Sequence, residues 1–381
     1  MVAAHVLEAR TPDGRLTWHA WLVEGRASAL FAVLAGTSLV LVAGRSGDRG
    51  ARTGLAVRAV LVAGWGLVLG ELDSGLAVIL TYYGVLFLLG LPFLRLRAGV
   101  LLAWAGAWVV VGPVASQLLR PHLPVRGTDS PTSGQLAHPG HLLSELLLTG
   151  YYPCLTWLPY LLLGMALGRC DLRSRSVQTG LVLGGLAGSV LALVVSRALT
   201  EQDWVLRRVV PDAGRYGDVS TADAFVNAVS GGLHGTTPAE GSWTWLLVVA
   251  PHSGTPFDLV ETGASAALVI GLCLLLVTWL GATVQRAVAV CFGAGTMTLS
   301  LYSLHVLMRT DRVWPPEQPS SFGWHVVVLT VVGATFVALR TRGPLEAVVG
   351  RLSAGATRWP GRCPSPSGPR PPRSGRRPRR R

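Results

Sequence analysis

The stretch from Thr149 to Leu172 runs for about twenty residues before its first charged side chain, Arg169. A helix of that length can cross the roughly 30 Å hydrocarbon layer of a membrane. Pro153 and Pro159 interrupt it, and tyrosine, threonine and tryptophan residues lie around them. In lipid, backbone groups freed by proline need partners from neighbouring helices or a water-lined cavity. We therefore expect this helix to face protein or a cavity. A proline-kinked packing helix with interfacial aromatic residues is the alternative.

Apolar runs of similar length recur along the chain. Half of the 381 residues are hydrophobic and the mean hydropathy is +0.46, so the chain carries too few charges for a soluble protein of its size. We predict an all-α fold, a polytopic transmembrane helix bundle of nine full spans plus a truncated first helix, with residues 1–350 as one domain. The expected spans are 26–44, 54–71, 75–94, 98–119, 142–168, 178–199, 262–281, 284–307 and 322–340.

The segment from Met1 to Glu8 is apolar but too short to span a membrane. It lacks the basic start and long apolar core of a signal peptide. We expect it to be the outer end of a helix whose first half is missing.

Every basic residue is arginine, and twelve of the 33 lie between Arg340 and Arg381. If this tail is cytoplasmic, two thirds of the arginines fall on the inner side, as the positive-inside rule requires. We therefore predict a multi-pass protein of the plasma membrane with a cytoplasmic C-terminal tail.

The tail itself, residues 351–381, is rich in arginine and proline and is expected to be disordered. An anionic inner leaflet would attract it. Because its charge is confined to one short segment beside the bilayer, we do not interpret the net charge of +13 as a sign of nucleic-acid binding.

Two outer loops collect polar residues, 120–141 and the long loop 200–263. Loops of the second length are usually functional or disordered, and its segment 243–258 could dip into the membrane. The five cysteines show neither disulfide nor zinc spacing, and the closest histidine pair, His138 and His141, lies in a Pro-Gly loop. We predict no metal site.

Two runs of small residues, Gly184–Gly188 and Gly293–Gly295, are typical of closely packed membrane helices.

Ionisable side chains gather at the expected outer helix ends. Polar groups at membrane depth are expensive and therefore often functional, although each one alone also fits a position in headgroups or water. Together they suggest acid–base chemistry, because a histidine can take a proton from a hydroxyl while a carboxylate orients it. The group comprises His5, His19, Glu24, Arg26, Glu71, Asp73, His141, Glu145, His252, Ser253, Asp258 and His305.

Four stretches carry a family resemblance. They are G-R-A-S-A-L-F-A-V-L-A-G-T-S-L-V-L (25–41), T-G-Y-Y-P-C-L-T-W-L-P-Y-L-L-L-G-M-A-L-G-R (149–169), P-H-S-G-T-P-F-D (251–258) and G-T-M-T-L-S-L-Y-S-L-H-V (295–306). Together they resemble actinobacterial membrane proteins related to the catalytic domain of heparan-alpha-glucosaminide N-acetyltransferase. They are also similar to neighbouring uncharacterised multi-span families of membrane acyltransferases.

The resemblance implies transfer of an acyl group from cytoplasmic acyl-CoA to an acceptor at or across the membrane, with a histidine central to the chemistry. His19 is the nearest match to the family's catalytic histidine. His5 corresponds to a histidine that ends the first helix in many bacterial relatives. Those relatives begin with an R-x-x-x-x-D-x-A-R-G-like helix start that this chain lacks, so we expect the sequence to be incomplete at its N-terminus.

We predict an integral membrane acyltransferase that moves an acetyl group from acetyl-CoA to a glycan or similar acceptor on the outer side. The predicted catalytic residues are His19, His5 and Glu24. The predicted substrate-binding residues are Arg26, Tyr151, Tyr152, Thr156, His252, Ser253, Asp258 and His305, and those proposed to pair with CoA phosphates are Arg45, Arg49, Arg95, Arg97 and Arg169.

Two alternatives remain open. The inner arginines can serve topology alone, and the protein can be a non-catalytic carrier or export component for a lipid or small solute. The expected partners are membrane lipids and the acceptor, and the oligomeric state is left open.

The predicted orientation is tested at the native Cys363, which lies in the tail. A membrane-impermeant thiol reagent added to intact cells should leave Cys363 unlabelled, and it should label a cysteine introduced into loop 120–141. Labelling of Cys363 from outside would contradict the orientation.

Overall fold

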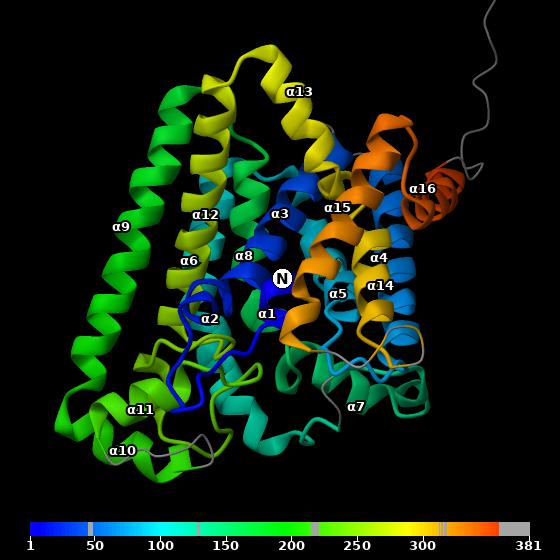
Figure 1. The fold of residues 1–381 in the computed structure, drawn as a ribbon. Coiled ribbons are helices and arrows are strands. Elements are labelled where there is room, and N and C mark those ends of the chain that lie inside the picture. Colours follow the sequence, from blue (N-terminus) through cyan, green and yellow to red (C-terminus); the bar gives the residue numbers. More distant parts are fainter. Residues whose placement is uncertain are drawn as a thin grey trace, which may run out of the picture.

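The computed structural model describes residues 1–44, 49–127, 130–214, 221–311, 313, 315 and 318–357. These residues form helices and loops without a strand, which confirms the all-α prediction (Figure 1). The α-helices are α1 (Val2–Val6), α2 (Trp18–Val23), α3 (Arg26–Ala43), α4 (Arg49–Gly70), α5 (Leu80–Gly90), α6 (Ala98–Leu119), α7 (Pro139–Ser144), α8 (Cys154–Leu167), α9 (Arg175–Thr200), α10 (Asp203–Ala213), α11 (Ala222–Val229), α12 (Pro256–Trp279), α13 (Ala282–Cys291), α14 (Thr298–Met308), α15 (Phe322–Ala338) and α16 (Pro344–Thr357). Shorter helical turns are η1 (Leu91–Arg95), η2 (Arg120–His122), η3 (Ser133–Ala137), the π-helical η4 (Glu145–Thr149), η6 (Trp243–Leu247), η7 (Gly293–Thr296) and η8 (Pro319–Ser321).

Five helical segments within the described part of the chain are long and apolar enough to cross a membrane. A sixth candidate is the pair formed by 139–149 and 154–167, which is bent by 57° at the break between them. The regions of the other three predicted spans contain the shorter apolar helices Leu80–Arg95, α14 and α15. The total of nine spans therefore remains a prediction.

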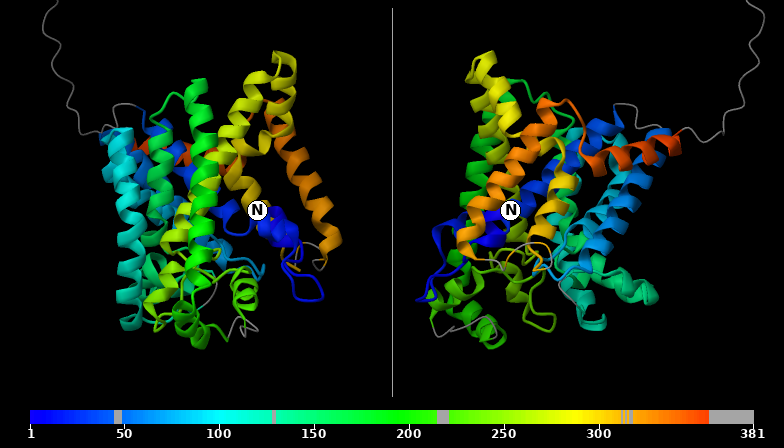
Figure 2. Two further views of the ribbon diagram at one scale, coloured as in Figure 1. Left: turned by 90° about the vertical axis from the view of Figure 1, so that its left-hand side faces the viewer. Right: turned by 45° about the vertical axis from the view of Figure 1, so that its right-hand side comes forward.

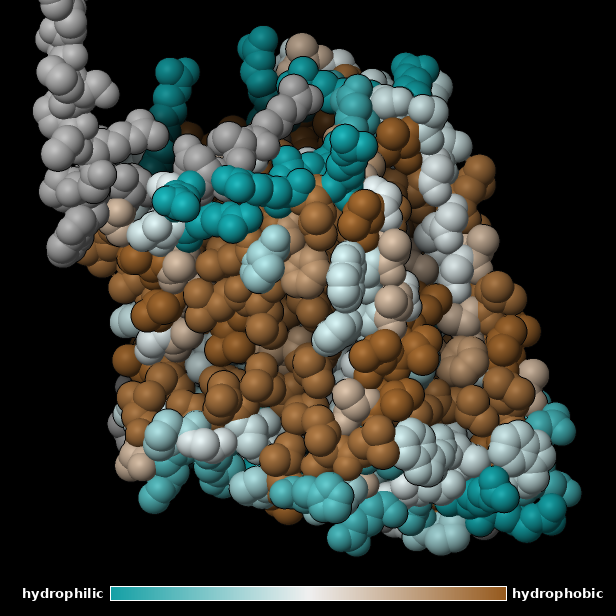
Figure 3. Space-filling model, turned by 180° about the vertical axis from the view of Figure 1, so that it is seen from behind, coloured by the Kyte–Doolittle hydropathy of each residue, from teal (hydrophilic) through white to brown (hydrophobic). Residues whose placement is uncertain are grey.

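The helices of the bundle run roughly side by side, and α1 lies among them (Figures 1 and 2). We call the end that carries the links 95–97, 168–174 and 339–343 the arginine end. The links 71–79, 120–138 and 201–255 form the opposite, loop end. α16 lies across the arginine end and contacts α4 and α14. On one face of the molecule a broad apolar band separates the hydrophilic side chains of the two ends, as expected for a protein surrounded by lipid (Figure 3).

α8 occupies the interior of the bundle. Twelve of its fourteen residues are buried, and α3, α5 and α6 pack around it. Trp108 on α6 donates its indole N–H to the Leu155 carbonyl oxygen at 2.8 Å. This oxygen has no helical partner four residues later, because Pro159 has no backbone N–H. The expectation that this stretch faces protein is confirmed.

α3 and α8 approach so closely that their backbones touch. A Cβ atom at Gly164 would lie 1.8 Å from the Val33 carbonyl oxygen, and one at Gly36 would lie 2.1 Å from that of Leu161. Thr37 donates a hydrogen bond of 2.9 Å to the Gly164 carbonyl. Small residues allow this contact, since van der Waals packing and interhelical hydrogen bonds hold helices together in lipid.

α9 and α12 form a second close pair. The residues of α9 that are buried form one stripe, Gln178, Gly185, Ala192, Ser196 and Thr200. The predicted role of the glycine runs is confirmed at Gly185 and Gly188, which pack on α12, and at Gly293, which packs on α15. Gly184 is open, because it lies on the other side of α9.

The segment between α9 and α12 is folded. Its helices α10, α11 and η6 enclose a small apolar core around Phe225 and Trp245, so Trp245 is packed inside this segment. α12 begins at Pro256, earlier than the expected start near residue 262, because the Thr255 hydroxyl caps the Asp258 N–H and proline suits the first helical position. The predicted loop 200–263 is therefore shorter and can hold side chains in place.

Replacing Gly164 by alanine tests the contact between α3 and α8. The added methyl group meets backbone atoms that cannot move alone, so Gly164→Ala should lower the free energy of unfolding by about 2 kcal/mol. The matched change Gly180→Ala, in the open face of α9, should be neutral or stabilise by up to about 1 kcal/mol. Thermal unfolding of both variants in detergent measures the difference, and equal effects would contradict the packing.

Candidate functional site

The loop that precedes α12 holds His252 in a fixed position. His252 has a left-handed backbone conformation, with φ of 56°. Its carbonyl accepts a hydrogen bond of 2.8 Å from the Gly235 N–H, and Gly254 N–H donates to Asp258 Oδ2 at 3.0 Å. Non-glycine residues adopt this conformation rarely, and it is retained where surrounding bonds determine it. The loop is thus built to present His252.

Aromatic rings surround the His252 imidazole. The Trp157 ring lies parallel to it, with 6.3 Å between the ring centroids. The rings of Tyr151 and Tyr152 meet it edge to face, with centroid distances of 5.4 and 5.6 Å. The Nδ1 atom of His252 is buried and has no hydrogen-bond partner among the described residues. A buried polar atom without a partner is costly, and a water or another molecule that bonded this nitrogen would remove the cost.

A cavity of about 200 Å³ lies beside these rings, and we call it the histidine cavity. Gly25, with φ of 68°, brings the junction of α2 and α3 against Pro251 on one side of it. The walls contain four groups that can exchange or share a proton, His5, Glu24, His234 and His252. Its remaining lining residues are Met1, Ala4, Val23, Gly25, Ala27, Ser28, Gly75, Leu76, Ala77, Tyr151 and Tyr152.

His5, at the end of α1, forms a hydrogen bond with a residue that does not line the cavity. Its Nδ1 lies 3.0 Å from Nε2 of His305 on α14. His305 Nδ1 in turn lies 3.0 Å from Nδ1 of His325 on α15. None of the described residues bonds His5 Nε2, so this nitrogen is available to a molecule in the cavity.

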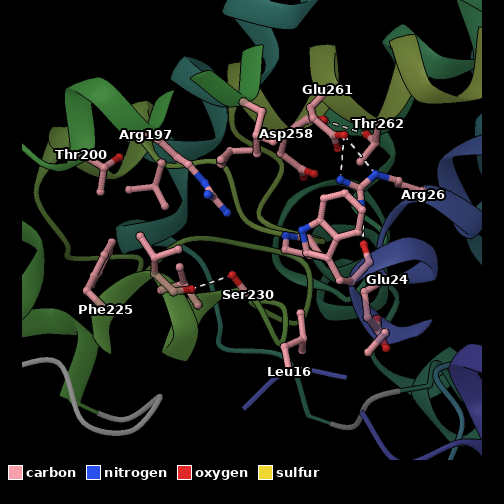
Figure 4. Close-up of a pocket in the computed structure, with 18 residues that line it drawn as sticks. Leu16, Glu24, Arg26, Arg197, Thr200, Phe225, Ser230, Asp258, Glu261 and Thr262 are labelled. Carbon is pink, nitrogen blue, oxygen red and sulfur yellow. Dashed lines mark hydrogen bonds and ion pairs between the residues drawn. The ribbon is translucent and has the colours of Figure 1, made fainter. Parts of the chain in front are cut away.

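A second, smaller hollow of about 50 Å³ adjoins the first, with Glu24 in the walls of both. Here Arg26 forms an ion pair with Glu261 of α12, with Nη2 and Oε1 2.9 Å apart, and Ser189 of α9 donates to the same oxygen. Figure 4 shows the Arg197 side chain extending into this hollow opposite Arg26. We call it the Arg26 hollow.

The structure brings five of the predicted site residues together in the histidine cavity. They are His5, Glu24, Tyr151, Tyr152 and His252. Arg26 and Asp258 line the adjacent hollow, and His305 stands behind His5. Thr156 and Ser253 are buried near the His252 loop. The Thr156 hydroxyl donates a hydrogen bond to the Pro153 carbonyl, and the Ser253 hydroxyl donates one to the Thr255 hydroxyl.

His19 lies apart from both spaces. It is on α2, where its Nδ1 is 3.3 Å from the Thr17 hydroxyl and its ring meets the edge of Trp18. Neither the histidine cavity nor the Arg26 hollow includes it. Its catalytic role remains a prediction.

The arginines predicted to bind CoA phosphates belong to the arginine end. Arg49 begins α4, Arg97 precedes α6, and Arg169 follows α8 and donates to the Leu94 carbonyl. Arg95 ends η1 at the same end. Arg45 lies outside the described residues, so the structure does not place it.

Sequence reasoning did not single out four residues of these sites, His234, Glu261, Arg197 and His325. His234 could have been found, because like His252 it is a loop histidine within two residues of a glycine. The others lie within helices, and only the tertiary packing shows their neighbours.

The geometry suits proton transfer in a space that is poor in water. Imidazole and carboxylate groups converge on a cavity walled by tyrosine rings and apolar side chains, which is the arrangement expected for general acid–base catalysis. Among the described residues no group of three or more His, Cys, Asp or Glu side chains is arranged to hold a metal ion.

Comparison with known proteins gives one family. The model described as "Heparan-alpha-glucosaminide N-acetyltransferase, catalytic" matches residues 5–200, from α1 to the end of α9. No match was found among curated proteins or among solved structures. The matched part supplies His5, Glu24 and the two tyrosines of the histidine cavity, whereas His234 and His252 lie beyond it.

The pH dependence of stability should report the burial of His252. Burial and, to a smaller extent, the neighbouring His234 together lower the pKa of His252 from 6.5 to about 4. Between these pH values the unfolded chain binds more protons than the folded one, so the histidine destabilises the fold as the pH falls from 6.5 towards 4. The Tm of the wild type relative to His252→Gln should therefore be constant above pH 7 and fall below it.

Thermal unfolding in detergent between pH 7 and pH 4 measures this difference. The exposed His122 offers a control, and His122→Gln should follow the wild type at each pH. A difference between the wild type and His252→Gln that does not change with pH would contradict the assignment.

Proposed function

The chain belongs to the family of the heparan-alpha-glucosaminide N-acetyltransferase catalytic domain, and we propose that it transfers an acetyl group from acetyl-CoA to an acceptor bound in the histidine cavity. The acceptor is a glycan or another molecule with a hydroxyl or amino group. The grouping of His5, Glu24 and His252 around one cavity carries this proposal.

His5 is the general base in this proposal. Its Nδ1 is bonded to His305, and this bond fixes the ring and leaves Nε2 for the cavity. A histidine whose second nitrogen is held by a partner is the arrangement used by many acyl-transfer enzymes. His5 Nε2 takes the proton from the acceptor as the acceptor attacks the acetyl carbonyl carbon, and the C–S bond to CoA breaks.

His252 and the tyrosines shape the same space. The buried Nδ1 of His252 lacks a partner among the described residues, and a polar atom of the acceptor or of the acetyl group would satisfy it. The rings of Tyr151 and Tyr152 exclude water from the reacting atoms. Water exclusion strengthens hydrogen bonds to the charge that develops on the carbonyl oxygen.

The donor approaches from the arginine end. Arg169 follows the C-terminus of α8 and Tyr152 precedes its N-terminus, and a helix of fourteen residues is about 21 Å long. CoA phosphates bound by Arg95, Arg97 or Arg169 therefore require the acyl arm to extend along α8 into the bundle. With the arginine end in the cytoplasm, as the positive-inside rule indicates, the acceptor enters from the loop end on the outer side of the plasma membrane.

Acetyl transfer is measured with the purified full-length chain in lipid nanodiscs, radiolabelled acetyl-CoA and a panel of amino sugars, glycans and small alcohols. Loss of a positioned general base costs about 10²- to 10⁴-fold in rate, so His5→Gln should fall in that range. His19→Gln should change the rate far less, because His19 lies outside the cavity.

The outcomes separate the open alternatives. If His19→Gln lowers the rate of acetyl transfer as much as His5→Gln does, and both variants keep normal unfolding temperatures, His19 also has a catalytic role. A wild type that labels neither itself nor any acceptor would contradict the enzyme. Binding or movement of a lipid or solute that tolerates both substitutions would then identify a carrier.

A further inference from the structure

Three imidazoles from distant parts of the chain form a continuous hydrogen-bonded row. His5 comes from α1, His305 from α14 and His325 from α15, and both links measure 3.0 Å between ring nitrogens. His305 and His325 are buried, with 3% and 0% of their surface exposed. One end of the row, His5, lies in the wall of the histidine cavity. We call these residues the histidine row.

The row has a direction that can reverse. A neutral imidazole has one N–H donor and one bare nitrogen acceptor. Both nitrogens of His305 are bonded, so if His305 accepts from His5 it donates to His325, and if it accepts from His325 it donates to His5. When His5 Nε2 gains a proton, moving both bridging protons by one step reverses the direction and leaves the extra proton on His325.

We propose that the histidine row takes up the charge of the acceptor's proton during acetyl transfer and returns a proton to the leaving CoA thiolate. This inference rests on the proposed function, and it assigns His305 and His325 as positioning and proton-relay residues for His5. Neither His305 nor His325 lies in the part of the chain that matches the family model.

The protons balance as follows. His5 Nε2 accepts the proton of the attacking hydroxyl or amine, His5 Nδ1–H passes to His305 Nε2, and His305 Nδ1–H passes to His325 Nδ1. His325 then carries a proton on each nitrogen, so the positive charge lies at the end of the row away from the cavity. CoA leaves as the thiolate with the electron pair of the broken C–S bond and takes the proton from His5 Nε2. At the same time the proton on His325 Nδ1 returns to His305 Nδ1 and the proton on His305 Nε2 returns to His5 Nδ1, so the row regains its first direction without exchange at the buried His325.

Electrostatics favours moving the positive charge away from His5. The positive charge of Arg309, one turn beyond His305, acts on both His5 and His305, and His252 also faces His5. A positive charge kept on His5 or His305 would be repelled at short range in a low-dielectric interior. A shift of the row's protons places that charge on His325, away from the reacting atoms.

His305→Gln is the principal test, because an amide can donate and accept a hydrogen bond but cannot pass a proton between two nitrogens. We expect kcat for acetyl transfer to fall at least about 10²-fold with KM changed less than about twofold. In mixtures of H₂O and D₂O, the wild-type rate should curve with deuterium content because several protons move, whereas the variant should respond linearly. His325→Asn should behave like His305→Gln, and His122→Gln should match the wild type.

A measurement without turnover separates this inference from the proposed function. In the full-length protein labelled with ¹⁵N-histidine, nitrogen chemical shifts distinguish the protonated from the bare ring nitrogen. His325→Asn should alter the nitrogen signals of His5 through His305, whereas His122→Asn should not. Unfolding temperatures show whether each variant is folded.

The results have defined meanings. A wild type that acetylates no acceptor contradicts the proposed function. If the nitrogen signals of His5 still change in His325→Asn, the hydrogen-bonded row is supported in that case as well. Active His305→Gln and His325→Asn proteins with wild-type kcat and isotope response overturn the relay and leave the acetyltransferase intact. Unchanged His5 signals in a folded His325→Asn protein also overturn it.

Discussion

The backbone contact between α3 and α8 is the constraint on which the rest of the structure depends. Gly36 and Gly164 let two helices meet without side chains between them, and this contact fixes α8 in the interior. α8 begins two residues after Tyr152, and α3 begins directly after Gly25. The same pair of helices that holds the bundle together therefore sets two walls of the histidine cavity.

Polar groups in the interior of the bundle are cut off from water, and several of them are hydrogen-bonded to neighbouring helices. Thr37 bonds the Gly164 carbonyl, Trp108 bonds that of Leu155, and Glu261 is surrounded by Arg26 and two serines. Because lipid offers no hydrogen bonds, each such group needs a partner within the protein. Several buried polar atoms of the described residues lack such a hydrogen-bond partner, and among them His252 Nδ1 belongs to a residue that lines the histidine cavity.

The local features of the chain could be predicted from the sequence, and the breaks in its helices could not. Apolar runs indicated the helices, and uncharged length with prolines indicated that α8 is internal. The helix expected from residue 75 begins instead at Leu80, because the Ser130 hydroxyl bonds the backbone of Leu76 and Val78 in place of helical partners. The span expected at 284–307 is divided at Gly293–Thr296, where glycine packs on α15.

The sequence predicted which residue types form the candidate site, but it predicted only in part which of them lie together. Histidines and acids near the loop end were identified, yet the bond between His5 and His305 joins residues 300 positions apart, and no periodicity reveals that. His325 and Glu261 sit in apolar helices, where a single sequence offers no reason to pair them with a partner. Resemblance favoured His19, whereas packing places His5 in the cavity.

The histidine cavity is composite, because α1 to α8 provide one side and the segment between α9 and α12 provides the other. The small core around Trp245 packs within that second side. Substitutions in this segment would therefore reshape the cavity that we propose for the acceptor and leave residues 5–200, which match the family model, unchanged. Under the proposed function, the choice of acceptor is then set largely outside the part of the chain that identifies the family.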